Sequence, residues 1–481
     1  MKRGLPAVDM EAKYQERLKR YTVAMRNGKP DRIPIRPFAA EFAAKYAGYT
    51  CQQVTHDYQL AFDAVCKTAS DFDWDAVVGN MVYVWTGLTQ AISLRYYGAP
   101  GLDVDPNTGF QFREPPEAEA FMKPEEYDEL IEDPTAFLFN TWLPRVAEDV
   151  SPMGAPTSYR NNLSFVKGGM AMLQYFGALG EQGARLRREC GAPSAIAGIF
   201  KAPLDIIGDK LRGYLGLTMD LLERPEKVLA ACEALMPHLC QVGLGSSDPE
   251  ATAPITFWMH RGCVPFINHE QFDRFYWPTL KPIIEEFWKQ GHQTLFYAEG
   301  NWDAHLDAFA ELPDQSIIYH VDHGDIFKVH ERLGGKFCLS GGLPNYLLTV
   351  GSPDEVRAQC KAIIDGVAQD GGYIMDASAI VQNDATVENM RAMTEFTREY
   401  GVYSADGTCE DPAYPLEDPA RVTGLSRTPA PRKTPAGVCI PWAEKRKEIP
   451  EIKGDEAIAE RVWNDIEGLA YTYIWHCLLS F

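Results

Sequence analysis

The sequence predicts a (β/α)8 barrel, with helices before the barrel and a proline-rich extension after it. Apolar runs of strand length alternate with amphipathic segments about eight times over roughly 400 residues, as they do in barrels of this kind. Residues 293–344 show the pattern most clearly, because strand, helix, strand, helix and strand follow one another there. A doubly wound open sheet is the alternative, weakened by the absence of a glycine-rich dinucleotide fingerprint.

The expected elements take their limits from apolar periodicity, capping residues and helix breakers. A loop with a first strand is expected at residues 31–42, and further strands at 74–81, 193–200, 253–260, 294–298, 316–319, 336–339 and 372–380. Helices are expected at residues 9–27, 62–70, 122–134, 168–189, 203–235, 270–290, 302–312, 325–333, 352–371 and 386–401. Pro134 stops the third helix, Arg224–Pro225 breaks the fifth into two, and Gly401 ends the last.

The chain is expected to divide into a barrel domain at residues 1–404 and an extension at residues 405–481. After about residue 405 the sequence is proline-dense and aperiodic, which is typical of wrapping or mobile segments. The final segment AYTYIWHCLLSF is too short to span a membrane and too apolar to lie in water. We expect it to pack on its own barrel or on a second subunit, and we expect a homo-oligomer.

Composition excludes several classes of function. The net charge of −21 argues against a nucleic-acid-binding protein and against an anionic membrane surface as partner. No apolar run is long enough for a transmembrane helix, and residues 1–21 lack the apolar core of a signal peptide. The 11 cysteines have no framework spacing, which fits a cytoplasmic protein. Without a CxxC pair or a phosphate loop, a nicotinamide, nucleotide or iron–sulfur enzyme is not expected.

Potential metal ligands occur where three successive strands are predicted to end. Glu299 follows the strand at 294–298, His320 follows the strand at 316–319, and Cys338 lies near the end of the strand at 336–339. Chemistry in parallel α/β folds sits at the carboxyl ends of the strands. A carboxylate, an imidazole and a thiolate satisfy a catalytic zinc and leave a fourth position open.

Each candidate also has a purely structural interpretation. Glu299 can cap the following helix, His320 can be a hydrogen-bonded core histidine, and Cys338 can be core packing. Other candidates are His260, as a substitute ligand or substrate contact, and Asp322, as the residue that orients a histidine. The aromatic candidates are Tyr297, which we place with Asp322 among the catalytic residues, and Trp258 and Trp302, which we place among the substrate contacts.

Several segments resemble the uroporphyrinogen decarboxylase superfamily and, within it, the corrinoid-dependent methyltransferases. They are RYTVAMRNGKPDRIPI (20–35), APLDIIGDKLRGYLG (202–216), EQFDRFYWPTLKPIIEEF (270–287), FYAEGNW (296–302), CLSGGLPNYLLTVGSPDEV (338–356) and GGYIMDASAIVQNDATVENMRAMTEFTREYG (371–401). The resemblance covers roughly residues 20–403 and implies a (β/α)8 barrel with its pocket at the carboxyl ends of the strands.

Two departures from the family pattern narrow the expected function. Authentic decarboxylases carry an arginine-rich loop for their polycarboxylate substrate, whereas the corresponding residues 36–46 contain one arginine. Thiol-alkylating relatives bind zinc through a His-x-Cys pair and a later cysteine, and those positions hold Tyr297, Glu299 and approximately Ser378. The sequence instead looks like methyltransferases of methyl-ether demethylation, in which a glutamate and a histidine about twenty residues later help to bind zinc.

The resemblance therefore implies a zinc-dependent methyltransferase. It is expected to move a methyl group from a small methylated donor to the cobalt(I) corrinoid of a partner protein. The first candidate for the donor is a methoxylated aromatic compound. The chain itself has no cobalamin-binding motif. A zinc with few thiolate ligands is a hard Lewis acid suited to polarising an ether oxygen. The alternatives are a metal-free decarboxylase and a non-catalytic small-molecule-binding member of the fold.

Overall fold

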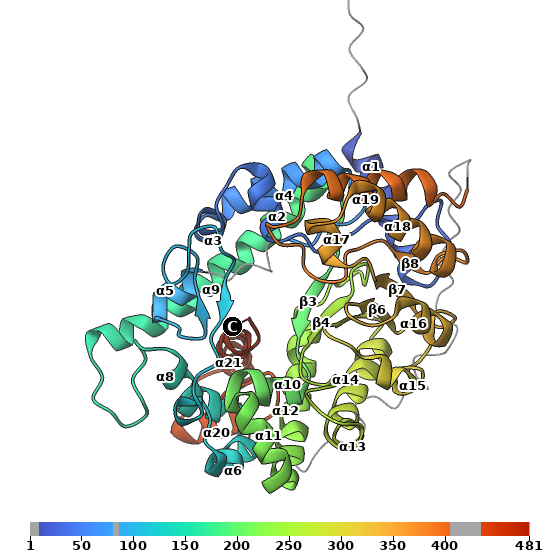
Figure 1. Cartoon of the computed structure of the whole chain (residues 1–481). Coiled ribbons are helices and arrows are strands. Elements are labelled where there is room, and N and C mark those ends of the chain that lie inside the picture. Colours follow the sequence, from blue (N-terminus) through green and yellow to red (C-terminus); the bar gives the residue numbers. More distant parts are fainter. Residues whose placement is uncertain (1–8, 80–85, 405–433, 481) are drawn as a thin grey trace, which may run out of the picture.

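The computed structural model describes residues 9–79, 86–404 and 434–480 (Figure 1). Within them, parallel strands pair in the order in which they follow one another along the chain. The strands of the main sheet are β3 (Ala197–Phe200), β4 (Ile255–Met259), β5 (Thr294–Ala298), β6 (Ile317–Val321), β7 (Cys338–Gly341) and β8 (Tyr373–Ile374). Their order is β3-β4-β5-β6-β7-β8. A doubly wound open sheet reverses its strand order at a switch point, so this alternative does not fit. The predicted α/β fold with a parallel sheet is confirmed.

Two further extended segments close the sheet into a ring. Ile35 pairs in parallel with Met375, directly after β8. The carbonyl oxygen of Ile35 accepts a hydrogen bond from the backbone N–H of Asp75 at 2.9 Å. Val77 then pairs in parallel with Ser194, just before β3. Within the described residues, eight parallel segments therefore surround one interior, consistent with the predicted (β/α)8 barrel.

Helices cover the outside of the ring, and Figure 1 shows α15, α16 and α18 outside the later strands. The helices before β3 are α1 (Met10–Met25), α2 (Glu41–Ala47), α3 (Cys51–His56), α4 (Tyr58–Phe72), α5 (Thr86–Ile92), α6 (Tyr127–Glu132), α7 (Pro134–Phe137), α8 (Leu143–Val146) and α9 (Tyr159–Arg185). Those after β3 are α10 (Pro203–Asp205), α11 (Tyr214–Glu223), α12 (Pro225–Gly245), α13 (His269–Gln271), α14 (Trp277–Lys289), α15 (Leu306–Phe309), α16 (Ile326–Leu333), α17 (Asn345–Thr349), α18 (Pro353–Val367), α19 (Val387–Tyr400), α20 (Trp442–Glu448) and α21 (Glu456–Ser480).

Local chemistry fixes the helix limits much as predicted. Arg224 alone separates α11 from α12, and Pro225 opens α12, since proline suits the first turn of a helix and cannot continue one. Ser352 and Glu355 form a capping box at the start of α18, and Thr386 caps α19. The last two residues of the strand predicted at 74–81 lie outside the described residues.

Strand register sets the height of each side chain inside the ring. Tyr297 is paired with His320, and His320 with Ser340, while Cys338 is paired with Ile318. Alternate side chains of a strand share a face, and two residues span about 6.6 Å. Glu299 therefore lies one layer above His320, and Cys338 lies one layer below it. The members of one interior cluster from β5 to β7 are Leu295, Tyr297, Ile318 and Cys338.

Helix α21 packs against helices of its own chain. Trp475 Nε1 donates a hydrogen bond to Thr135 Oγ1 of α7 at 3.2 Å. The hydroxyl of Tyr471 lies 3.0 Å from His238 Nδ1 on α12. The final apolar segment thus lies on the barrel's own helices. Residues 405–433, where the proline-rich extension is predicted, lie outside the described residues.

Helix α12 is the described helix that is long and apolar enough to cross a membrane, by length and composition alone. Of its most apolar window, 61% is buried inside the protein, where it packs against α6, α14 and β3. Core helices of globular proteins share these properties.

Candidate active site

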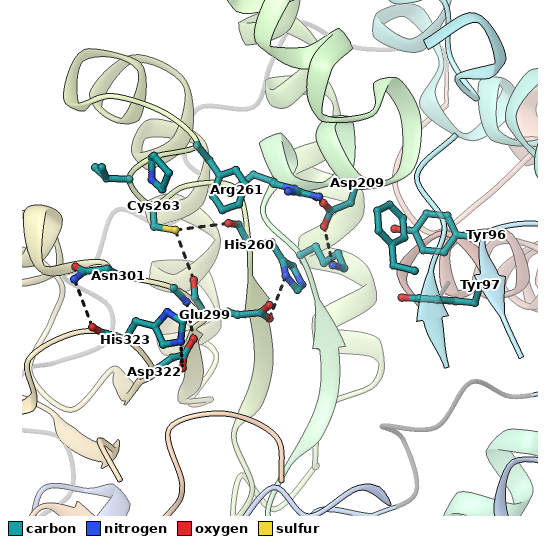
Figure 2. Close-up of a pocket in the computed structure, with 16 residues that line it drawn as sticks. Tyr96, Tyr97, Asp209, His260, Arg261, Cys263, Glu299, Asn301, Asp322 and His323 are labelled. Carbon is teal, nitrogen blue, oxygen red and sulfur yellow. Dashed lines mark hydrogen bonds and ion pairs between the residues drawn. The ribbon is translucent and has the colours of Figure 1, made fainter. Parts of the chain in front are cut away.

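A cavity of about 650 Å³ lies at the carboxyl ends of β3 to β6 (Figure 2), where parallel barrels place their functional residues. The residues that directly follow these four strands all line it: Lys201, His260, Glu299 and Asp322. Because β4 and β5 are paired in register up to Met259 and Ala298, the next residue of each strand is brought beside the other.

His260 and Glu299 form a hydrogen-bonded pair on the cavity wall (Figure 2). His260 Nδ1 lies 3.1 Å from Glu299 Oε2, and the side chains are 28% and 46% exposed. Burial acts to raise the pKa of Glu299, but His260 and Lys201 outweigh it, so that this pKa lies below its ordinary value. Glu299 is therefore a carboxylate that holds His260, and both side chains are accessible to a bound molecule.

A second group of charges lies beside this pair. Lys201 Nζ is 3.1 Å from one carboxylate oxygen of Asp209, and Arg261 Nε is 2.8 Å from the other. Burial acts to raise the pKa of Asp209, yet Lys201, His260 and Arg261 hold it well below the ordinary range. Asp209 is thus an anion shared by two cations.

Asp322 is held by the loop that follows β5. Its Oδ2 accepts the backbone N–H of Gly300 at 2.8 Å, and its Oδ1 lies 3.5 Å from His323 Nε2. Asn301 Nδ2 donates to the His323 carbonyl at 3.4 Å. Burial raises the pKa of Asp322, against the opposing effect of the Gly300 hydrogen bond. This carboxyl group therefore braces the loops around the cavity.

Aromatic side chains form the wall across from these residues. Tyr96 and Tyr97 belong to the segment around the hairpin of β1 (Tyr97–Gly98) and β2 (Gln111–Phe112). Their rings pack edge to face at 4.6 Å, and Figure 2 shows both across the cavity from His260 and Glu299. Phe112 and Phe266 also line the cavity. Such a wall suits a flat apolar ligand.

The structure brings His260, Glu299 and Asp322 of the predicted site residues together on this cavity. It does not bring His320 and Cys338 there. Their expected positions at strand ends are wrong, because β6 continues through His320 to Val321 and β7 begins at Cys338. Both side chains therefore lie inside the barrel, on different layers.

The predicted aromatic residues do not line the cavity where their side chains are described. Tyr297 is buried and stacks on His320, with ring centroids 4.3 Å apart. Trp302 is buried and donates its Nε1 hydrogen to the Glu299 carbonyl at 2.9 Å, so it supports the loop that carries Glu299. The side chain of Trp258 lies outside the described part of the chain.

The three predicted zinc ligands do not fit a shared metal ion. His320 uses both ring nitrogens: Nε2 donates to the Ser378 carbonyl at 2.8 Å, and Nδ1 accepts from the Ser340 hydroxyl at 2.9 Å. Burial raises the pKa of the Cys338 thiol well above its ordinary value, whereas a zinc ligand must be a thiolate. Across the described residues, no group of three His, Cys, Asp or Glu side chains is arranged to hold a metal.

Several cavity residues were missed by the sequence reasoning. The positions of Lys201 and Arg261 could have been noticed in the sequence. Lys201 directly follows the strand predicted at 193–200, and Arg261 directly follows His260, which ends the strand predicted at 253–260. Asp209 lies in the helical stretch after α10, inside the family-like segment 202–216, but neither a strand end nor a ligand spacing marks it. The pair Tyr96 and Tyr97 borders a segment rich in glycine, proline and aspartate, whose folding back over the barrel is set by tertiary packing.

Comparison with known proteins supports the family resemblance. Residues 169–400 match the family model for uroporphyrinogen decarboxylase (URO-D). Among solved structures, a methyltransferase from Methanosarcina mazei is similar with a TM-score of 0.51 and 15% sequence identity, over 80% of this chain and 98% of that methyltransferase. This likeness shows a shared fold. No curated protein matches the sequence.

Proposed function

We propose that this chain, URO-D-like over residues 169–400, is a methyltransferase that takes a methyl group from a small methylated donor. The acceptor is the cobalt(I) corrinoid of a separate partner protein, as the resemblance in sequence implies. The observation that carries the proposal is the accessible His260–Glu299 pair beside an aromatic wall, at the carboxyl ends of the strands. The first donor class is a methoxylated aromatic compound, which makes the chain the methyl-removing component of an O-demethylase.

The pair supplies what ether cleavage requires from a protein. When the methyl group passes to the nucleophile, the ether oxygen keeps the electron pair of the broken bond and takes up a proton. A protonated His260 has that proton on Nε2 while Nδ1 donates to Glu299, and the Glu299 carboxylate stabilises the imidazolium. Acid catalysis of this kind contributes roughly 10²- to 10⁴-fold to a rate.

The charges favour this function over decarboxylation of a polycarboxylate. Such a substrate needs several cationic side chains with free hydrogen-bond donors. Apart from histidines, the cations among the described residues that line this cavity are Lys201 and Arg261. The two share one carboxylate, Asp209, and two cations are too few for a substrate with several carboxylates. A donor with few charges fits this cavity better.

Methylation of a cobalt(I) corrinoid, followed by visible absorbance, tests the proposal. Methoxylated aromatic compounds are offered first, then a quaternary amine, a thioether and a halomethane. We expect Glu299→Gln and His260→Ala to slow demethylation of an ether by roughly 10²-fold or more. The control, Arg357→Gln, changes an exposed ion pair on α18 and is expected to keep full activity. No methyl transfer from any donor would favour a non-catalytic binding protein.

A further inference from the structure

Arg261 is held rigidly on the wall of the cavity. Its backbone N–H donates to Asp205 Oδ1 at 2.6 Å, and Asp205 Oδ2 accepts from the hydroxyl of Tyr276 at 2.7 Å. Its Nε donates to Asp209 Oδ1 at 2.8 Å. The guanidinium group also lies over the ring of Phe266, 4.9 Å from the centroid. These contacts fix the side chain before any ligand binds, so little entropy is lost when it makes a further bond.

The outer edge of this guanidinium group is available to a ligand. The hydrogen bonds of Arg261 within the described residues use its backbone N–H and its Nε, and none uses the two terminal nitrogens. The side chain is 16% exposed and lines the cavity. Two parallel N–H groups on a planar fork match the two oxygens of a carboxylate.

The polar contacts on this side of the cavity leave the terminal nitrogens of Arg261 to a ligand. The head groups of Lys201 and Arg261 share one carboxylate, Asp209. The second carboxylate nearby, Asp205, accepts from the Arg261 backbone N–H and the Tyr276 hydroxyl. The Glu299 carboxylate is hydrogen-bonded to His260 instead. In Figure 2, Arg261 and Asp209 lie above His260, whereas Glu299 and Asp322 lie below it. One end of the cavity therefore holds the Arg261 fork and the other end holds the Glu299 and Asp322 carboxyl groups.

We infer that Arg261 binds a carboxylate group of the methyl donor, so that the donor is a methoxylated aromatic carboxylate. This inference rests on the proposed function and narrows it. A ring carrying a carboxylate and a methoxy group places the carboxylate at Arg261 and the ether oxygen at His260, while the ring faces Tyr97 and Phe112. Arg261 is then the residue that selects acids over neutral aromatic ethers.

Equilibrium binding tests the inference without any catalytic step. Calorimetric titration of the full-length protein compares 4-methoxybenzoate with 4-methoxybenzamide, which has nearly the same shape and no charge. We expect the wild type to bind the benzoate about 10- to 100-fold more tightly, as charged hydrogen bonds imply. Arg261→Gln is expected to reduce this ratio to about 2-fold, and Arg261→Lys to an intermediate value because it keeps the charge and loses the fork. Arg357→Gln, on the surface of α18, is expected to behave as wild type.

Three outcomes would overturn the inference: equal affinity of the wild type for both ligands, unchanged affinity of Arg261→Gln for the benzoate, or no binding of either ligand. Thermal melting of each variant checks folding, and Arg261→Lys covers the case in which Arg261→Gln does not fold. Failure of the proposed methyltransferase function gives a different result from these three outcomes. In that case the protein binds the benzoate selectively, but no methyl group reaches the corrinoid in the methylation experiment. Efficient demethylation of the neutral amide would keep the function and reject the role of Arg261.

Discussion

Inside the barrel, His320 is enclosed by a polar network. The Ser340 hydroxyl that donates to its Nδ1 accepts in turn from Arg36 at 3.0 Å. Arg36 forms an ion pair with Asp376 at 3.0 Å, and both side chains are fully buried. Burial, and then the nearby Arg36, lowers the pKa of His320 to about 3. The imidazole is therefore neutral and hydrogen-bonded on both sides, which is a structural role.

Replacing this residue tests the structural role. We expect His320→Ala to lower the free energy of unfolding by about 3 kcal/mol near neutral pH, because it leaves a cavity and removes partners from Ser340 and Ser378. Chemical denaturation measures the loss. Elemental analysis of the same protein is expected to show the same zinc content as the wild type. Zinc present in the wild type and lost from a folded His320→Ala would instead restore His320 as a ligand.

The destabilisation by His320→Ala is also expected to depend on pH. The folded-state pKa of about 3 lies below the ordinary value of 6.5, so protonation favours the unfolded chain. The stabilisation from neutral His320 is thus present above about pH 6.5 and is lost as the pH falls toward 3. Between pH 7.5 and 4.5 the difference between variant and wild type should shrink by about 2.7 kcal/mol, since roughly two pH units below 6.5 each contribute about 1.36 kcal/mol. A difference that stays constant over this range contradicts the assignment.

At the scale of single elements, the sequence predicted strand positions better than strand ends. The strand at 294–298 was placed correctly, and Glu299 after it does line the cavity. The strand at 316–319 extends through His320 to Val321, because a buried histidine with two hydrogen bonds continues a strand as well as an apolar residue does. Polarity alone cannot distinguish a polar core layer from a strand end, and this error put Cys338 and His320 into one site.

The end of β7 depends on a glycine. Gly341 has a φ of +82°, and a Cβ there would clash with the carbonyl oxygen of Val321 and lie 3.0 Å from His320 Cε1. We expect Gly341→Ala to lower the free energy of unfolding by roughly 2–4 kcal/mol, since strain and overpacking combine. Gly335→Ala is the matched control, because nothing lies within 4 Å of its added Cβ. Equal melting temperatures of the two variants would contradict this view of the strand end.

At the scale of the whole molecule, the fold was predictable because the βα alternation repeats along the chain. Its closure through residues near Ile35 and Val77 was less visible, since single bridges rather than long strands complete the ring. The cationic half of the cavity was missed for a related reason. Lys201, Asp209 and Arg261 come from two βα units and meet through packing alone, so no local pattern joins them.

The C-terminal helix offers the last test at this scale. Trp475 of α21 is fully buried, stacks on His238 of α12 with ring centroids 4.7 Å apart, and donates to Thr135 of α7. We expect Trp475→Ala to lower the free energy of unfolding by roughly 3–5 kcal/mol, the usual cost of removing a buried tryptophan. Removing all of α21 should cost more, and it should reduce solubility before it changes the chemistry of the cavity.

Trp463→Ala on the same helix is the matched control, since that side chain is partly exposed and its indole donates to the Ile440 carbonyl near α20. Its expected cost is about 1 kcal/mol. Chemical denaturation and methyl-transfer rates of both variants separate stability from activity. If α21 is part of the barrel's own core, Trp475→Ala unfolds at a lower denaturant concentration than the wild type. The methyl-transfer rate of the folded variant is then the same as that of the wild type. If Trp475→Ala is as stable as Trp463→Ala, the helix contributes little to the barrel, and its buried face belongs to some other contact.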